Sequence, residues 1–125
     1  MDSSNICNQH KGKLIEHHAA KFLQQQGLRI LQRNFATKMG EIDIIAQHNN
    51  DLVFIEVRFR KNLLYGGPLA SINYYKQQKI IRCAKFYLQT HQWTNCLSCR
   101  FDVIAVTNSM EQPNTEWIQN AFYLS

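Results

Sequence analysis

Hydrophobic residues recur along this chain with two spacings, one typical of helices and one typical of strands. Apolar residues at intervals of three or four positions predict helices over residues 11–26 and 73–90. Shorter runs rich in β-branched and aromatic residues predict strands. These runs are residues 28–35, 41–47, 52–59 and 99–107, with 115–123 as a short strand or a turn. The predicted order is therefore helix–strand–strand–strand–helix–strand.

The ends of both helices carry local signals. Gly27 follows the apolar stripe of the first helix and supplies its stop, because glycine readily takes the left-handed conformation that ends helices. Asn73 is a suitable N-cap for the second helix. That helix combines an apolar face with a basic one formed by Lys76, Lys79, Arg82 and Lys85.

Residues 41–59 predict a β-hairpin at the centre of the domain. The polar cluster 48–51 separates its two apolar runs, and asparagine tolerates the positive φ of tight hairpin turns. Side chains alternate along a strand, so facing pairs follow from the turn position. With 49–50 as a two-residue turn, the facing pairs are Asp43 with Glu56 and Glu41 with Arg58, all on one face.

Two facing carboxylates repel each other, at a cost of roughly 0.2–1 kcal/mol on a wet surface and more when partly buried. A divalent cation such as Mg²⁺ converts this repulsion into coordination, because hard ions take carboxylate oxygens. Asp43 and Glu56 are therefore candidate metal ligands. The alternative is an exposed hairpin face with a Glu41–Arg58 ion pair and incidental acids, and the local pattern alone leaves both open.

The size of the chain predicts one domain. With 125 residues, 45% hydrophobic and 18% charged, the chain is long enough for one core and too short for two. Residues 1–10 predict a flexible polar leader before a single domain over 11–125. A hairpin followed by a helix and another strand predicts an α/β fold, with a mixed sheet between helices in three layers.

The charge balance favours a polyanionic partner. The formal net charge is +5, although a solvated basic surface has the same composition. Arg60 and Lys61 follow the hairpin and suit phosphate contacts, as does the basic face of the second helix. Glu16 is either a carboxylate near the start of the first helix, favoured there by the helix dipole, or a third acid directed at the hairpin.

The cysteines and the absence of a long apolar run bear on location. No apolar run reaches membrane-spanning length, and the N-terminal residues lack the apolar core of a signal peptide. We therefore expect a cytoplasmic protein with reduced thiols and no membrane association. Cys96 and Cys99 have the spacing of half a zinc or redox site, but no second pair follows them.

Several blocks together resemble the YraN-type family of small bacterial proteins, whose function is uncharacterised. The blocks run through nearly the whole chain after the leader. They include Gly12-x-x-x-Glu16-x-x-Ala19, Asn34, Gly40–Ala46 (GEIDIIA), Phe54–Arg58 (FIEVR), Lys76-Gln77, Arg100–Val103 (RFDV) and Asn120–Phe122 (NAF). The resemblance implies the restriction-endonuclease-like fold, which also houses archaeal Holliday-junction resolvases. Because such resolvases act as dimers, it leaves a homodimer as an expectation.

The resemblance also implies roles for particular residues. It implies Glu16, Asp43 and Glu56 as metal-site acids, with position 58 as the basic catalytic residue. It marks Lys76 and Gln77 as residues at the rim of the site. The family pattern has lysine at position 58, whereas this chain has Arg58, which stays charged and reaches differently.

The leading hypothesis is a nucleic-acid-binding protein, with DNA as the expected partner, that carries a Mg²⁺- or Mn²⁺-dependent endonuclease-like phosphodiesterase site. Its predicted catalytic residues are Glu16, Asp43, Glu56 and Arg58, and its predicted nucleic-acid contacts are Arg60, Lys61, Lys76, Gln77 and Lys79. The alternatives are a DNA- or RNA-binding module that keeps the nuclease fold without cutting, and a structural subunit.

Overall fold

The computed structural model describes residues 3–60, 72–91, 98–107 and 114–123. The elements in these ranges are α1 (Ser3–Gln25), β1 (Arg29–Thr37), β2 (Gly40–His48), β3 (Asp51–Arg60), α2 (Tyr74–His91), β4 (Ser98–Thr107) and β5 (Asn114–Phe122). The predicted order is confirmed through β4, and the segment predicted as a short strand or a turn is the fifth strand.

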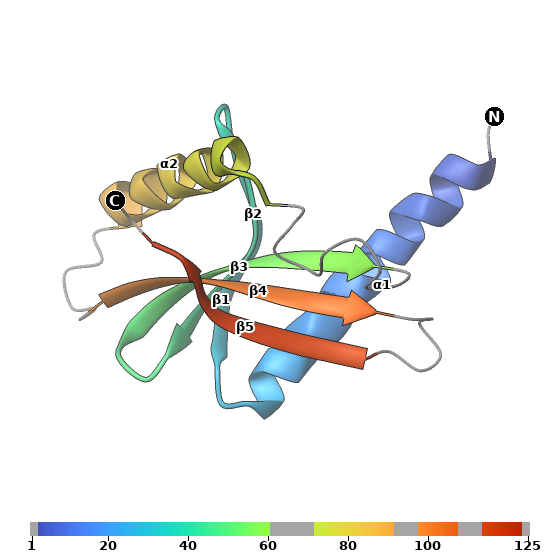
Figure 1. Cartoon of the computed structure of the whole chain (residues 1–125), viewed down its shortest axis with the longest axis horizontal. Coiled ribbons are helices and arrows are strands. Elements are labelled where there is room, and N and C mark those ends of the chain that lie inside the picture. Colours follow the sequence, from blue (N-terminus) through green and yellow to red (C-terminus); the bar gives the residue numbers. More distant parts are fainter. Residues whose placement is uncertain (1–2, 61–71, 92–97, 108–113, 124–125) are drawn as a thin grey trace.

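The strands form one mixed sheet in the spatial order β1-β2-β3-β4-β5. β3 and β4 are parallel, and the other neighbouring pairs are antiparallel. A parallel pair needs a crossover, and α2 lies in the connection between β3 and β4. Figure 1 shows α2 on one face of the sheet and α1 on the other, so the predicted three-layer α/β arrangement is confirmed. This arrangement is consistent with a nuclease-like fold.

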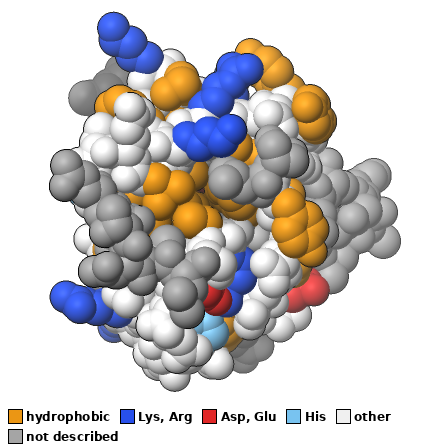
Figure 2. Space-filling view, turned by 90° about the vertical axis from the view of Figure 1, so that its left-hand side faces the viewer, with side chains coloured by type: hydrophobic (Ala, Val, Ile, Leu, Met, Phe, Trp, Pro, Cys, Tyr) orange, Lys and Arg blue, Asp and Glu red, His pale blue; other side chains and the backbone are white. Residues whose placement is uncertain are grey.

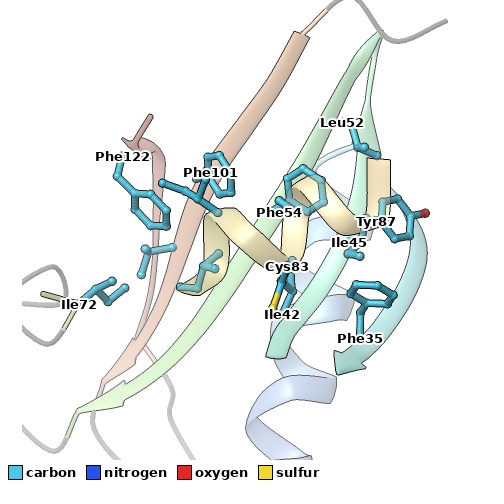
Figure 3. Close-up of a cluster of buried hydrophobic side chains, with 14 residues drawn as sticks. Phe35, Ile42, Ile45, Leu52, Phe54, Ile72, Cys83, Tyr87, Phe101 and Phe122 are labelled. Atoms are coloured by element: carbon cyan, nitrogen blue, oxygen red, sulfur yellow. The ribbon is translucent and has the colours of Figure 1, made fainter. Parts of the chain in front are cut away.

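Each helix closes its own hydrophobic core. Phe54 and Phe101 from the sheet stack at 5.4 Å between ring centroids and belong to the cluster that contains Tyr87 of α2 (Figure 3). On the opposite face, Leu23 of α1 packs in a second cluster with Val53 and other sheet residues. Neighbouring residues such as Val53 and Phe54 therefore serve different cores, because side chains alternate along a strand.

The first helix begins at Ser3 rather than at Lys11, so its predicted start is wrong. The flexible leader over residues 1–10, before a single domain, stays a prediction. A polar sequence does not exclude a helix. Once the stripe around Ile15 and Leu23 is docked, adding further turns avoids the costly nucleation step. Within the described residues, no helix combines the length and the hydrophobicity needed to cross a membrane.

The second helix starts as predicted. The side-chain Oδ1 of Asn73 accepts the backbone N–H of Lys76 at 2.8 Å, which is the hydrogen bond of an N-cap. Ile80, Ile81 and Ala84 are buried against the sheet. The cap fixes where the helix begins, and the buried residues fix which way it faces. Lys76 and Lys79 thereby receive defined positions beside the hairpin.

Candidate functional site

The hairpin turn has the predicted register, but the two strands separate at their other end. His48 pairs with Asp51, Asn49 has a φ of 56°, and the paired region runs as far as Ile44 and Ile55. Beyond that pair, Asp43 Oδ2 accepts the Val57 backbone N–H at 2.8 Å. A side-chain oxygen thus takes the place of a carbonyl of the neighbouring strand, and the Asp43 carboxylate is held against β3.

The separation of the strands opens a cleft of about 370 Å³ between α1, β2, β3 and α2. Apolar side chains such as Ile15 and Ile80 form part of its wall. Its charged lining residues are Glu16, Glu41, Asp43, Glu56, Arg58, Lys76 and Lys79. The structure therefore brings all four predicted catalytic residues together in one place, from three different elements.

Glu56 is the most buried acid of this cleft. It is 5% exposed, and Arg58 Nη2 lies 3.3 Å from its Oε2 atom. Its other oxygen, Oε1, is buried and has no hydrogen-bond partner among the described residues. Burial and the nearby Asp43 charge together raise the pKa of Glu56 to about 8, although Arg58 and Lys76 oppose the shift. The carboxylate is short of positive charge and of donors.

Asp43 shows the same imbalance to a smaller degree. Burial raises its pKa to about 6, against the lowering effect of the Val57 N–H donor. The charges of Glu16 and Glu41 raise the pKa further, and the Arg58 charge lowers it. Four acids thus act on one another in this cleft, and the basic groups around them do not fully compensate.

The ion pair between Glu41 and Arg58, which belonged to the alternative of an exposed hairpin face, is wrong. Arg58 instead contacts Glu56, two residues away on the same strand and therefore on the same face. The prediction extended the hairpin ladder to positions 41 and 58, whereas the paired region runs only to Ile44 and Ile55. The Nε atom of Arg58 is buried and has no partner within the described part of the chain.

Asn34 of β1 is a residue of this site to which the sequence gave no role. It has a φ of 55°, in the left-handed region that asparagine tolerates. With the amide nitrogen facing the two acids, it donates to Glu41 Oε1 at 2.9 Å and to Glu16 Oε2 at 3.1 Å. The available signals were an asparagine inside a predicted strand and the presence of Asn34 among the blocks that carry the family resemblance. Its contact with Glu16 of α1 depended on tertiary structure.

Glu16 is the third acid, directed toward the hairpin. It lines the cleft, and its Oε2 also lies 3.9 Å from Arg33 Nη2. The alternative, a carboxylate stabilised by the dipole at a helix start, is wrong because α1 begins at Ser3 and places Glu16 well inside the helix.

The predicted nucleic-acid contacts separate into three groups. Lys76 and Lys79 line the cleft. Gln77 instead donates from Nε2 to the Ile72 carbonyl oxygen at 3.0 Å, which anchors the start of α2. Arg60 ends β3, but its side chain lies outside the described part of the structure, as does Lys61.

The donor set fits a hard divalent cation better than a soft one. Among the described residues, no group of three or more histidine, cysteine or acidic side chains is arranged to hold a metal ion. Mg²⁺ needs fewer protein ligands, because it keeps several waters and binds through one or two carboxylates plus substrate phosphates. The unpartnered Oε1 of Glu56 and the raised pKa values match that requirement. Cys96 lies outside the described residues, so the cysteine-pair alternative stays a prediction.

Comparisons with known proteins identify the family. The sequence model of the uncharacterised protein family UPF0102 matches residues 15–106, a stretch that contains every charged lining residue of the cleft. A UPF0102 protein of Psychromonas ingrahamii is 51% identical over 112 residues, covering 90% of this chain and 88% of the relative. A UPF0102 protein of Colwellia psychrerythraea is 38% identical over 121 residues, covering 96% and 94%. The chain belongs to the UPF0102 family, and its resemblance to the YraN-type proteins is confirmed.

Proposed function

We propose that this member of the UPF0102 family binds nucleic acid and carries a Mg²⁺- or Mn²⁺-dependent phosphodiesterase site of the endonuclease type. The observation that carries the proposal is the pair of buried carboxylates, Asp43 and Glu56, in a cleft that also holds Arg58, Lys76 and Lys79. A metal ion would supply the positive charge that the two carboxylates lack. A phosphate would supply negative charge to the cationic side chains.

Asp43 and Glu56 would hold the metal ion, and Glu16 would act on it directly or through a water. When bound, the ion supplies Lewis acidity, which lowers the pKa of a water and neutralises charge at the phosphate. The unpartnered Oε1 of Glu56 is the atom best suited to ligation, because it loses no existing hydrogen bond. Asn34 holds Glu16 and Glu41 at fixed positions beside these acids.

Cationic side chains would receive the phosphate. Lys76 and Lys79 reach the cleft from α2, and Arg58 reaches it from β3. The net charge of +5 favours the approach of a polyanion to the protein as a whole. On the face drawn in Figure 2, lysine and arginine side chains gather at the top, the side on which α2 lies in Figure 1, and acidic ones are few.

Arg58 supports a second candidate function, a binding module that keeps the nuclease fold without cutting. The family pattern places lysine at this position, and lysine can orient or deprotonate a water. Arginine stays charged, and here the guanidinium is engaged with Glu56. Metal ligation and phosphate binding do not depend on that lysine, so both would persist in a protein that cleaves weakly or not at all.

One assay tests the proposal and separates the two candidates. The protein is incubated in Mg²⁺ or Mn²⁺ with single-stranded, duplex and branched DNA and with RNA, beside the Asp43→Ala/Glu56→Ala double variant. Cleavage by the native protein alone supports the phosphodiesterase. Binding without cleavage supports the binding module. Neither binding nor cleavage would contradict both and favour a structural subunit.

A further inference from the structure

Two adjacent tyrosines at the start of α2 stand in solvent beside the cleft. Tyr74 is 74% exposed and Tyr75 is 68% exposed, far above the 3% of Tyr87 on the same helix. Their backbone is fixed, because the Asn73 cap sets the first turn. Single exposed aromatics are ordinary on protein surfaces, but two in sequence on an ordered helix end form a patch.

The patch is joined to the cleft by Lys79. This residue lies one turn after Tyr75, and its Nζ atom stands 4.6 Å from the centroid of the Tyr75 ring. A cation at this distance from a ring centroid is attracted by the negative face of the ring. Lys79 also lines the cleft, as does Lys76. The exposed Tyr75 ring is therefore next to Lys79, and Lys79 in turn lines the cleft that holds the buried acids.

This order of groups matches the chemistry of one strand of nucleic acid. Phosphates follow one another along the backbone, and each nucleotide carries a flat base that can stack on an aromatic ring. Inside a continuous duplex both faces of a base are covered by neighbouring base pairs. A ring at this position can therefore stack only on a base that is unpaired or at the end of a duplex.

We propose that Tyr75, with Tyr74 beside it, stacks an unpaired base of the strand whose phosphates contact Lys76 and Lys79. The inference rests on the proposed function and names its substrate class: nucleic acid with unpaired nucleotides next to the bound phosphate, in preference to continuous duplex. The lysines at the patch favour this polyanion over an apolar protein segment as the occupant.

Binding measured without divalent cations tests the inference apart from cleavage. Single-stranded DNA carrying one 2-aminopurine and a duplex of the same sequence are titrated with the native protein and with the variants Tyr75→Ala, Tyr75→Phe and Tyr123→Ala. Stacking quenches 2-aminopurine fluorescence, so the signal reports the contact directly. Tyr123 is 71% exposed outside the patch and serves as the matched control.

The expected result is a loss of single-strand affinity by roughly 5- to 150-fold in Tyr75→Ala, the range for losing one stacked base. Quenching should fall with it, whereas duplex affinity should stay unchanged. Tyr75→Phe should retain both affinity and quenching, because stacking needs the ring and not the hydroxyl, and Tyr123→Ala should behave as the native protein.

Three results would overturn the inference. Equal losses for duplex and single strand would assign Tyr75 to general binding. Unchanged affinities, with nucleic-acid binding intact, would remove the stacking role while leaving the proposed function standing. A change confined to the molecular mass in solution, measured by sedimentation, would assign the patch to a second copy of this chain. Absence of any nucleic-acid binding by the native protein would instead count against the proposed function.

Discussion

Two sets of buried charges lie against the β2–β3 hairpin, and they differ in how far neighbouring groups satisfy them. Asp102 of β4, opposite Ile55 of β3, is fully buried and accepts hydrogen bonds from Arg100 Nε at 3.0 and 3.1 Å. It also accepts hydrogen bonds from Trp117 Nε1 at 2.9 Å and from the Asn120 backbone N–H at 3.0 Å. We call these four residues the turn-end network.

Arg100 extends the turn-end network to the hairpin itself, because its guanidinium lies 3.0 Å from His48 Nδ1 and 3.6 Å from Asp51. At the opposite end, Glu56 Oε1 and Arg58 Nε are buried without partners among the described residues. A buried carboxylate in this fold can thus be fully satisfied by neighbouring donors. Where neighbouring donors do not satisfy it, as at Glu56, the proposed metal ion would supply the missing partner.

We expect the largest change in stability on removing Asp102, the acid of the turn-end network. We expect Asp102→Ala to lower the free energy of unfolding by about 3–5 kcal/mol, because it leaves Arg100 buried without its main partner. Asp43→Asn should stay within about 1 kcal/mol of the native protein, since it relieves repulsion. Denaturant unfolding at pH 7 measures both. Equal losses would mean that the cleft acids are also structural.

The pH dependence of stability is a second test of the difference between the satisfied carboxylate of Asp102 and the unsatisfied one of Glu56. Burial raises the pKa of Glu56 from 4.5 to about 8, so the folded state holds a proton that the unfolded state releases. The free energy of unfolding should therefore fall as pH rises from about 4.5 to about 8, by on the order of 4 kcal/mol. Glu56→Gln should flatten this fall, as measured by denaturant unfolding at several pH values. A native protein that gains stability over that range would contradict the shift.

The hairpin was largely predictable from local sequence, and the partners of its charges were not. The Asn49–Asn50 turn and the Asn73 cap depend on residues close together in the chain, so composition sufficed. No local signal marks where the pairing of β2 with β3 ends, beyond Ile44 and Ile55, so Arg58 was given the wrong partner. The turn-end network also escaped prediction, because Trp117 and Asn120 reach Asp102 only after β5 pairs with β4.

Lys76 and Lys79 line the cleft and are half-buried, whereas Arg100, the cation of the turn-end network, is 9% exposed. For the Lys76→Glu/Lys79→Glu variant we expect weaker nucleic-acid binding and a flatter salt dependence. Each lost duplex contact should lower the log–log slope by roughly 0.9. Titrations between low and moderate salt measure the slope. Arg82→Glu, on the exposed part of the same helix, is the matched control, and an equal effect there would argue for diffuse charge instead.

The smallest expected effect concerns Arg58. Because its guanidinium contacts Glu56, we expect the native protein to cleave weakly and Arg58→Lys to raise single-turnover cleavage in Mn²⁺. Affinity should not tighten, since an interaction made only in the transition state appears in turnover. The substrate is whichever nucleic acid binds best. Robust native cleavage that drops in Arg58→Lys would make Arg58 a competent catalytic residue.

Calorimetric titration with Mn²⁺ tests most directly the central proposal that Asp43 and Glu56 form a metal site. The native protein should bind Mn²⁺ more tightly at pH 8 than at pH 6, because the ion must displace the protons that the raised pKa values retain. The heat measured in buffers of different ionisation enthalpy should show that proton release. Asp43→Asn and Glu56→Gln should each abolish binding, while Asp51→Asn, beside the turn-end network, should leave it unchanged. Undiminished Mn²⁺ binding in both cleft variants would contradict the account.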